Sequence, residues 1–309
     1  MPAYNQFDCQ SPRQPYQDPR ALQTIGHPEL TCAACTPVTA WKTLNMNDME
    51  ATRDERPWAL VSGASGGLGQ AFSRHLASCG VNLVVTGRRH DVLDDLADQL
   101  TTRYGIQTIV HPCDISSASE RLALVNEIAG RGIIIDTLVN NAGFGAAGRI
   151  AETDPERQTS QVEVNCEAVV HLCGLLLPGM ITAKRGSIIN VASTAAFQPI
   201  PQFATYAASK SFVLSFTRAL WAETNGTGVR ATAICPGPTE TGFFDVAGVP
   251  RMAAGARRDP DDVVRTAFDA LARHRPYAVD GFVNRTVARL APHLPARLVM
   301  TQAEKYLQV

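Results

Sequence analysis

The chain has 309 residues, of which 45% are hydrophobic and 18% are charged. This length and composition indicate a folded protein with a sizeable core and exclude a disordered polymer. Lys and Arg number 28 and Asp and Glu number 29, so the formal net charge is -1, which disfavours nucleic acid or another polyanion as the main partner. The aromatic content of 6% also argues against a surface built to stack nucleic-acid bases.

Residues 1–56 differ in character from the rest of the chain. Prolines such as Pro12, Pro15 and Pro28 interrupt any helix there, and no apolar periodicity lasts more than a few residues. We therefore expect residues 1–56 to form a disordered N-terminal extension. Cys32 and Cys35 form a CxxC pair, but no second pair or matching histidines lie nearby, so we interpret them as solvent-facing thiols and expect no metal site.

Five cysteines lie singly in apolar sequence, namely Cys79, Cys113, Cys166, Cys173 and Cys235. A chain of this size needs no disulfides, so we interpret these residues as reduced thiols. No positively charged start followed by an apolar run marks a secretory signal, and no run of about 18 apolar residues marks a membrane span. We expect a cytoplasmic protein without a membrane span.

From Trp58 onward, short β-branched runs alternate with segments of helical periodicity. This alternation predicts one α/β domain over residues 57–309, with a doubly wound parallel sheet of the Rossmann type. The expected strands span residues 58–62, 82–86, 107–112, 134–140, 187–191 and 229–234, with a last strand near 277–279. The expected helices span residues 70–79, 91–104, 118–130, 162–183 and 206–223, with one or two more after residue 261.

A glycine-rich turn follows the first expected strand directly. Glycines with the spacing GxxxGxG allow backbone amides to approach a pyrophosphate, and the next helix supplies unpaired N–H groups at its start. The turn therefore predicts a dinucleotide site, and the alternative is a tight βα turn without a ligand. The candidate cofactor contacts are Gly63, Ser65, Gly66, Gly67, Leu68 and Gly69.

The second expected strand ends in Gly87, Arg88 and Arg89, with no carboxylate to bind a ribose 2′-hydroxyl. A guanidinium pairs well with a 2′-phosphate, which an acidic side chain would repel. The sequence therefore favours NADP(H) over NAD, with Arg88 as the phosphate contact. The alternative is that both arginines only face water.

Tyr206 and Lys210 are four residues apart on an expected helix and so share one face. An ammonium group favours phenolate, so we expect Lys210 to lower the pKa of Tyr206 and to make the phenol a general acid and base. Ser193 follows an expected strand, where its hydroxyl can bind the same substrate oxygen. This set predicts that a proton is exchanged at a carbonyl oxygen while a nicotinamide cofactor transfers hydride.

Together these segments resemble the short-chain dehydrogenase/reductase family over about residues 58–241, with Ser62 in place of the family's usual threonine. The resemblance implies a catalytic set of Asn165, Ser193, Tyr206 and Lys210, in which Asn165 holds a water that relays protons to the lysine. It also implies further cofactor contacts at Asp114, Ile115, Asn141, Tyr206 and Lys210, with Asn141 in the NNAG motif and Lys210 on the nicotinamide ribose.

The resemblance extends to the loop after the sixth expected strand. A contact to the nicotinamide carboxamide is assigned to Thr239, with Thr241 as the second choice. Residues 238–258 are the expected substrate lid, and its apolar part favours an apolar substrate. Arg251, Arg257 and Arg258 either bind an anionic tail or, as we prefer, face solvent.

The helix over residues 206–223 is apolar on more than one face, which predicts a homodimer or homotetramer. Residues 283–300 carry arginines among apolar side chains and either lie on a membrane surface or, as we prefer, pack on the substrate side.

The predicted function is an NADP-dependent short-chain carbonyl reductase or alcohol dehydrogenase that acts on a small-molecule carbonyl or alcohol substrate. A 3-oxoacyl or hydroxysteroid-like reductase remains an alternative because it uses the same residues. A non-catalytic NADP-binding regulator is the alternative of another class.

Overall fold

A computed structural model describes residues 56–243, 247–248 and 257–307. Every described residue belongs to one compact unit, which lies within Thr36–Val309. The predictions about the N-terminal extension, its CxxC pair, Arg251 and much of the lid lie outside the described residues.

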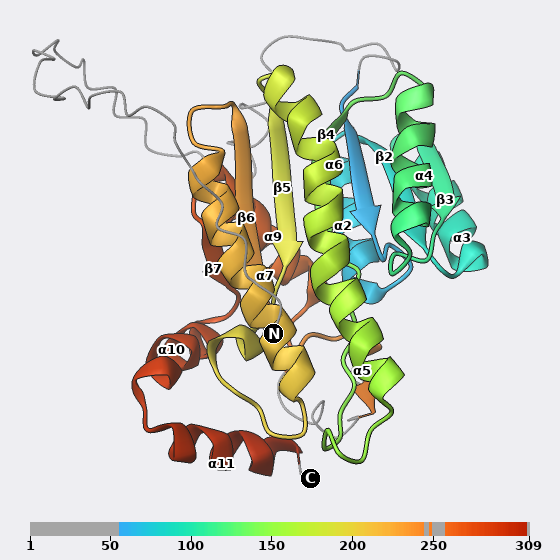
Figure 1. Ribbon diagram of the computed structural model, residues 1–309. Coiled ribbons are helices and arrows are strands. Elements are labelled where there is room, and N and C mark those ends of the chain that lie inside the picture. The colour runs from blue at the N-terminus through green and yellow to red at the C-terminus, as the bar shows by residue number, and fades with distance from the viewer. Residues whose placement is uncertain (1–55, 244–246, 249–256, 308–309) are drawn as a thin grey trace, which may run out of the picture. The chain divides into compact units, whose positions relative to one another are not determined.

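A parallel sheet of seven strands forms the centre of the fold (Figure 1), in the order β3-β2-β1-β4-β5-β6-β7. Each neighbouring pair of strands is parallel. The order changes direction at β1 and β4, which is where folds of this class bind ligands beyond the carboxyl ends of the strands. The strands are β1 (Trp58–Ser62), β2 (Asn82–Gly87), β3 (Thr108–Pro112), β4 (Ile135–Asn140), β5 (Gly186–Val191), β6 (Val229–Cys235) and β7 (Tyr277–Val279).

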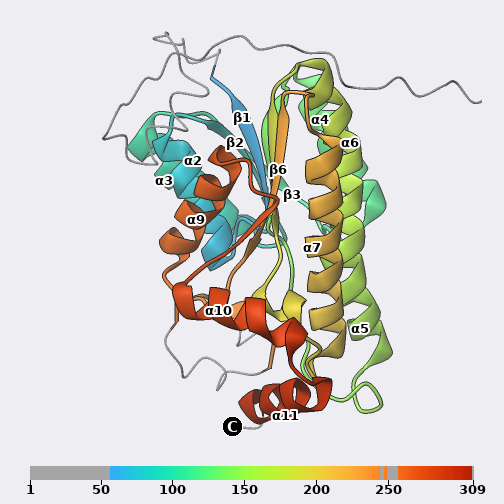
Figure 2. The same ribbon diagram turned by 90° about the vertical axis from the view of Figure 1, so that its left-hand side faces the viewer.

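Helices cover both faces of the sheet, as Figure 2 shows. One face carries α2 (Gly67–Ser78), α3 (His90–Tyr104) and α9 (Pro260–Ala272). The opposite face carries α4 (Ala118–Gly130), α6 (Ala168–Thr182) and α7 (Ala204–Glu223). This arrangement confirms the predicted doubly wound α/β fold.

Alternate residues of β1 belong to two separate core layers. Ala59 and Val61 pack with Phe72 and Leu76 of α2. Leu60 belongs to the layer on the other face, together with Leu172 of α6 and Val213 of α7. Because successive strand side chains point to opposite faces, a continuous apolar strand is buried on both sides.

Two helices begin three or more residues before their predicted start. Helix α2 begins at Gly67, three residues before the expected Gln70, because Gly66 takes an extended conformation and acts as its N-cap. The long helix begins at Pro155 rather than Val162, after the N-cap Asp154, whose side chain accepts a hydrogen bond from the Glu156 amide. Pro at the first position and Asp at the N-cap are strong start signals that the sequence prediction missed.

This long helix consists of α5 (Pro155–Val162), a π-helical turn η1 (Glu163–Glu167) and α6. Its length and composition would suit a membrane span. In the fold it packs on the sheet, where Leu172, Cys173 and Met180 are buried. The apolar character therefore serves the core of the domain.

The C-terminal helices lie at the end of the sheet toward which the strand arrows point in Figures 1 and 2. They are α10 (Phe282–Leu290), the short 3-10 turn η4 (Ala291–His293) and α11 (Ala296–Leu307). The predicted last strand at residues 277–279 is confirmed as β7.

Candidate active site

The turn between β1 and α2 depends on glycine at two positions. Gly63 has a φ of +63°, and a Cβ there would lie 2.8 Å from the Ala142 Cα. A Cβ on Gly69 would lie 2.3 Å from the Gly63 carbonyl oxygen. The first turn of α2 carries no acidic side chain, and its N-cap makes no side-chain hydrogen bond. Its leading N–H groups and partial positive charge therefore suit an anion.

Two arginines lie beside this turn. The Arg89 guanidinium donates a hydrogen bond of 2.6 Å to the Ser65 carbonyl oxygen, which fixes Arg89 against the turn. Arg88 is exposed, and its charge helps to lower the pKa of Asp114. Burial would raise the pKa of Asp114, but hydrogen bonds from Ser116 outweigh it and hold the carboxyl below its ordinary value. Arg88, Asp114 and Ser65 therefore belong to one area at the carboxyl ends of β1, β2 and β3.

The loop that contains Asp114 and Ile115 is held by a residue that the sequence prediction missed. Arg121 on α4 is fully buried and donates hydrogen bonds to the carbonyl oxygens of Ile115, at 2.6 Å, and Ser116, at 2.9 Å. The same guanidinium pairs with Glu167 of the long helix. A buried arginine seldom occurs without such partners. Glu167 lies too far along the sequence for its pairing with Arg121 to be predicted.

Asn141, in the predicted NNAG motif, connects the end of β4 to the glycine turn. Its Nδ2 donates to the carbonyl oxygens of Ser62, at 2.9 Å, and Gly63, at 3.0 Å. The Ser62 hydroxyl in turn accepts from the amides of Asn141 and Ala142. Asn141 therefore shapes the turn through its side chain.

Asn165 lies in the π-helical turn η1 and is completely buried. Its Nδ2 donates to the Phe144 carbonyl oxygen and to the Ser209 hydroxyl, both at 3.0 Å, and its Oδ1 accepts from the Phe144 amide at 3.1 Å. A Cβ on Gly143 would lie 3.0 Å from Asn165 Oδ1 and 3.2 Å from Lys210 Nζ. The two polar groups therefore converge on Gly143, and single-turn π-bulges of this kind occur frequently at functional sites.

Ser193 and Tyr206 lie together, as the spacing predicted. Ser193 follows β5 and is the N-cap of η2 (Thr194–Phe197), where its hydroxyl accepts from the Ala195 amide at 3.1 Å. Burial raises the pKa of Tyr206 to about 12, and a hydrogen bond with Ser193 works to lower it. The phenol and the serine hydroxyl can therefore bind one oxygen between them.

Lys210 is buried on the same face of α7 as Tyr206. Its Nζ donates a hydrogen bond of 2.8 Å to the Val191 carbonyl oxygen and lies 5.8 Å from the centre of the Tyr206 ring. Burial lowers the pKa of Lys210 to about 8, although Cys166 and Cys235 act to raise it.

We expected Lys210 to lower the pKa of Tyr206, but the residues of the chain alone raise this pKa above its ordinary value. Burial is the largest cause of this rise. The physical reason is the apolar surroundings of the ring, which disfavour the charged phenolate. Any further lowering has to come from positive charge that a bound cofactor brings.

Aromatic rings enclose Tyr206. Phe203 stacks on it with the ring centres 4.5 Å apart, and Phe243 lies tilted against it at 5.3 Å. Phe203 also approaches Gly145 so closely that a Cβ there would lie 2.4 Å from its Cζ. Ala303 of α11 belongs to the same apolar cluster. These walls favour an apolar substrate body, and sequence reasoning missed Phe203 because a single phenylalanine gives no motif.

The two threonines after β6 have different surroundings. The Thr239 hydroxyl donates to the Gly237 carbonyl oxygen at 2.9 Å, and Thr239 is buried. The Thr241 methyl lies over the start of α2, since a Cβ on Gly67 would be 3.0 Å from its Cγ2. The geometry therefore favours Thr241, the second choice of the sequence prediction, over Thr239 as the residue that faces the glycine turn.

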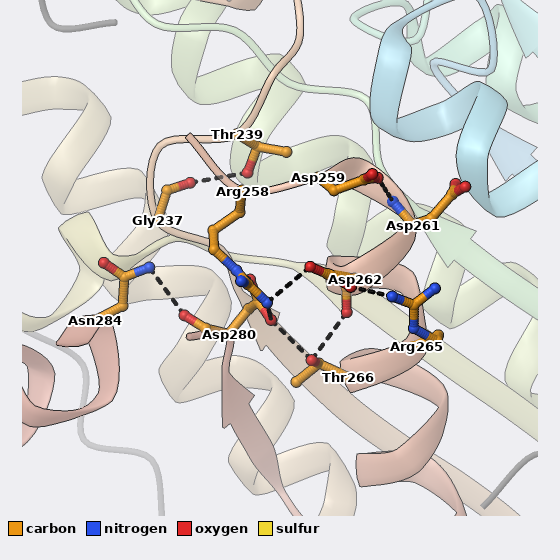
Figure 3. A network of polar contacts seen from close by, with 10 residues as sticks. All are labelled: Gly237, Thr239, Arg258, Asp259, Asp261, Asp262, Arg265, Thr266, Asp280 and Asn284. Carbon is orange, nitrogen blue, oxygen red and sulfur yellow. Dashed lines mark hydrogen bonds and ion pairs between the residues drawn. The ribbon is translucent and has the colours of Figure 1, made fainter. Parts of the chain in front are cut away.

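The two ends of the predicted lid are joined by backbone hydrogen bonds. The Arg258 amide donates to the Pro238 carbonyl oxygen at 2.8 Å, and the Glu240 amide donates to the Arg258 carbonyl oxygen at 2.9 Å. Figure 3 shows the Arg258 guanidinium directed at Asp280 and Asp262. Its Nε lies 2.7 Å from Asp280 Oδ2, and one terminal nitrogen lies 3.1 Å from Asp262 Oδ2.

The prediction that Arg258 faces solvent or binds an anionic tail is therefore wrong, because its guanidinium pairs with Asp280 and Asp262. It joins the lid to the end of β7 through Asp280, which is 1% exposed and also accepts a hydrogen bond from Thr266. Among the described residues, no group of three or more His, Cys, Asp or Glu side chains could hold a metal ion.

Comparison with known proteins agrees with this geometry. The family model for short chain dehydrogenases matches residues 57–248. An uncharacterized oxidoreductase of Staphylococcus saprophyticus is 33% identical over 213 residues, which cover 69% of this chain and 90% of that protein.

Solved structures give the same result. A 7beta-hydroxysteroid dehydrogenase is 26% identical with a TM-score of 0.73, over 80% of this chain and 96% of that one. An actinorhodin polyketide ketoreductase with NADPH is 30% identical with a TM-score of 0.65, over 74% of this chain and 96% of that one.

Proposed function

Because the chain belongs to the short-chain dehydrogenase family, we propose that it is an NADP(H)-dependent oxidoreductase that interconverts a carbonyl compound and the corresponding secondary alcohol through Tyr206. The observation that carries the proposal is the convergence of Ser193, Tyr206 and Lys210 at the carboxyl ends of the strands, beside the glycine turn.

The residues of the glycine turn fit the pyrophosphate of a dinucleotide. Gly63 and Gly69 leave no room for a Cβ against the neighbouring backbone, so the turn needs glycine at both positions to stay this tight. The start of α2 carries no acidic side chain and suits negative charge. We assign Ser65, Gly66, Gly67 and Leu68 to the same contact. When bound, NADPH supplies the hydride for carbonyl reduction.

Arg88 supports the choice of NADP(H) over NAD. It is exposed next to the turn, no carboxylate occupies the end of β2, and Arg89 holds the Ser65 carbonyl oxygen nearby. A guanidinium in this position attracts a 2′-phosphate. The related ketoreductase was solved with NADPH. Asp114 and Ile115 are proposed for the adenine contact.

We assign a separate role in proton transfer to each of the four residues. Tyr206 keeps its proton at neutral pH, since burial raises its pKa to about 12, and so can donate it to the carbonyl oxygen. Ser193 donates a second hydrogen bond to that oxygen and stabilises its developing charge. Lys210 holds positive charge near the phenol, and Asn165 holds the backbone at Phe144 beside Lys210.

The apolar walls define the substrate class that the site suits. Phe203 and Phe243 flank the reacting phenol, and Ala303 of α11 closes the same cluster. A carbonyl compound with an apolar body fits these walls. A 3-oxoacyl or a hydroxysteroid-like substrate satisfies this condition equally, and both a ketoreductase and a hydroxysteroid dehydrogenase are among the similar proteins.

A further proposal concerns assembly. Val162 and Val170 on the long helix and Phe212 on α7 are large apolar residues that remain exposed. They lie on two of the helices that cover one face of the sheet, which supports the expected homodimer or homotetramer. A measurement of mass by sedimentation tests it, and a monomer at micromolar concentration contradicts it.

Substitution of Tyr206 by Phe tests the proposed function against a non-catalytic regulator. We expect turnover of NADPH with a panel of apolar ketones to fall by about 10²-fold or more, while the Kd for NADPH measured by fluorescence stays unchanged. Tyr104→Phe on α3 is the matched control and keeps full turnover. A wild-type protein that binds NADPH but reduces no carbonyl compound supports the regulator instead.

A further inference from the structure

The C-terminal helices present a large apolar surface to solvent. Six of the large hydrophobic residues that remain exposed lie within residues 282–298. Phe282 and Val283 are the most exposed of those in the described part of the chain, at 81% and 72%. We call these six residues the C-terminal apolar face; they are Phe282, Val283, Val287, Leu290, Leu294 and Leu298. A patch of this kind marks an interaction site in a folded protein.

The four members on α10 share one side of that helix. At 3.6 residues per turn, Phe282, Val283, Val287 and Leu290 fall on the side opposite Ala288, which is buried. The helix is therefore anchored to the domain through its inner side, and its outward side is apolar apart from the exposed Thr286. Figures 1 and 2 both place α10 and α11 at the outer edge of the fold.

The charged residues within residues 281–303 have one sign. Arg285, Arg289 and Arg297 are exposed, and residues 281–303 contain no Asp or Glu. On α10, the helical spacing places Arg285 and Arg289 along one border of the apolar side. Exposed apolar residues bordered by arginines on a short helix are typical of helices that lie in a membrane interface.

The charge pattern also favours a membrane surface over a second copy of the chain as the partner of this face. An isologous contact would bring the same arginines of two protomers together, and the face offers no carboxylate to pair with them. An anionic lipid surface supplies both the negative charge for the arginines and the apolar phase for Phe282 and Leu290.

The inner side of α11 connects this face to the substrate site. Val299 and Ala303 are buried, Ala303 in the cluster that contains Phe203 and Tyr206, and Gln202 donates to Glu304 at 3.4 Å. This confirms the expected packing of α11 on the substrate side, whereas the outer surface of the same segment is free of such contacts in the described part of the chain.

We propose that the C-terminal apolar face binds the surface of an anionic lipid bilayer, with α10 lying in the interface and the substrate side of the domain turned toward the membrane. The proposal goes beyond the proposed function, because it concerns where the domain binds rather than which reaction it performs.

Vesicle flotation of the full chain tests the proposal without any use of activity. The probes are vesicles of phosphatidylcholine alone and vesicles that also contain phosphatidylserine. We expect binding to the anionic vesicles only, and about tenfold weaker binding for Arg285→Gln/Arg289→Gln and for Phe282→Ser/Leu290→Ser. Leu122→Ser on α4, an exposed apolar residue outside this face, is the control and binds like the wild type.

Three outcomes overturn the proposal. The first is the absence of binding to anionic vesicles, and the second is equal binding by the wild type and both double variants. The third is a wild-type dimer that Phe282→Ser/Leu290→Ser converts to monomer in sedimentation, because a second copy then covers this face. Unchanged NADPH binding by each variant confirms that it is folded.

Discussion

Lys210 Nζ lies 5.8 Å from the centre of the Tyr206 ring and donates its hydrogen bond to the Val191 carbonyl oxygen, so the ammonium group is held by β5 beside the phenol. The two groups respond to burial in opposite directions. Burial raises the pKa of Tyr206 to about 12 and lowers the pKa of Lys210 to about 8. Within the range of ordinary assays, Lys210 is therefore the member of the pair that changes charge.

This difference predicts the pH dependence of carbonyl reduction. As the pH rises through about 8, Lys210 loses its proton while Tyr206 keeps its own, so kcat declines toward pH 10 because the positive charge near the phenol is lost. In Lys210→Arg the guanidinium stays protonated, and the decline disappears from this range. The measurement is kcat from pH 6 to pH 10 for both proteins at saturating NADPH, and parallel profiles would contradict the assignment.

Arg88 and Arg89 have separable effects on cofactor binding. Arg88→Ala removes the group assigned to the 2′-phosphate, so we expect the Kd for NADPH to rise about tenfold or more while the Kd for NADH changes little. Arg89 holds the Ser65 carbonyl oxygen of the turn. Arg89→Ala is thus expected to weaken both cofactors by similar factors.

Fluorescence titration with NADPH and NADH measures all four constants. If the wild type binds NADH as tightly as NADPH, Arg88 does not select the cofactor.

What the sequence predicted about the site was local. The glycine turn and the pair Tyr206 and Lys210 depend on neighbours within a few residues, so their spacing alone places them on a turn and on one face of a helix. The sheet could be predicted for the same reason, since each strand is a short apolar run of its own.

The features of the site that the sequence could not predict depend on contacts between distant segments. The pKa of Tyr206 follows from burial by Phe203 and Phe243, and the latter comes from a different loop. The choice between Thr239 and Thr241 depends on the bridge that pairs Thr239 with Arg258. No spacing rule connects such positions, because the chain between them does not determine their separation in space.

The glycine turn allows a matched test of backbone proximity. A Cβ on Gly69 would lie 2.3 Å from the Gly63 carbonyl oxygen, whereas a Cβ on Gly66 would lie 3.5 Å from the same atom. Gly69→Ala therefore forces the turn apart, and we expect it to lower the free energy of unfolding by about 1–3 kcal/mol and to abolish NADPH binding. Gly66→Ala meets no such contact, and its φ of -86° suits alanine.

Urea denaturation and NADPH titration of both variants check this prediction. Equal stability and equal cofactor affinity of the two variants would show that the turn adapts to a side chain at either position.

The pair of Arg258 and Asp280 gives the last prediction, which separates the stability of the lid from the chemistry at Tyr206. Asp280 is 1% exposed, so Arg258→Met leaves a buried carboxylate with Thr266 as its remaining side-chain donor. Loss of one partner from a buried pair is costly, but the Arg258 side chain is 37% exposed, so we expect a decrease of about 2 kcal/mol in the free energy of unfolding. Asp280→Asn removes the charge as well. We therefore expect the double variant to lose less free energy of unfolding than the sum of the losses in the two single variants.

The Arg258 backbone bonds to Pro238 and Glu240 where the two ends of the proposed lid meet. Loosening of this junction is therefore also expected to raise KM for the ketone more than it lowers kcat. Arg265→Met on α9, which loses only an exposed pair with Asp262, is the control and keeps both the stability and KM. A fall in kcat at unchanged KM would instead place Arg258 in contact with the reacting groups, contrary to its position beside β7.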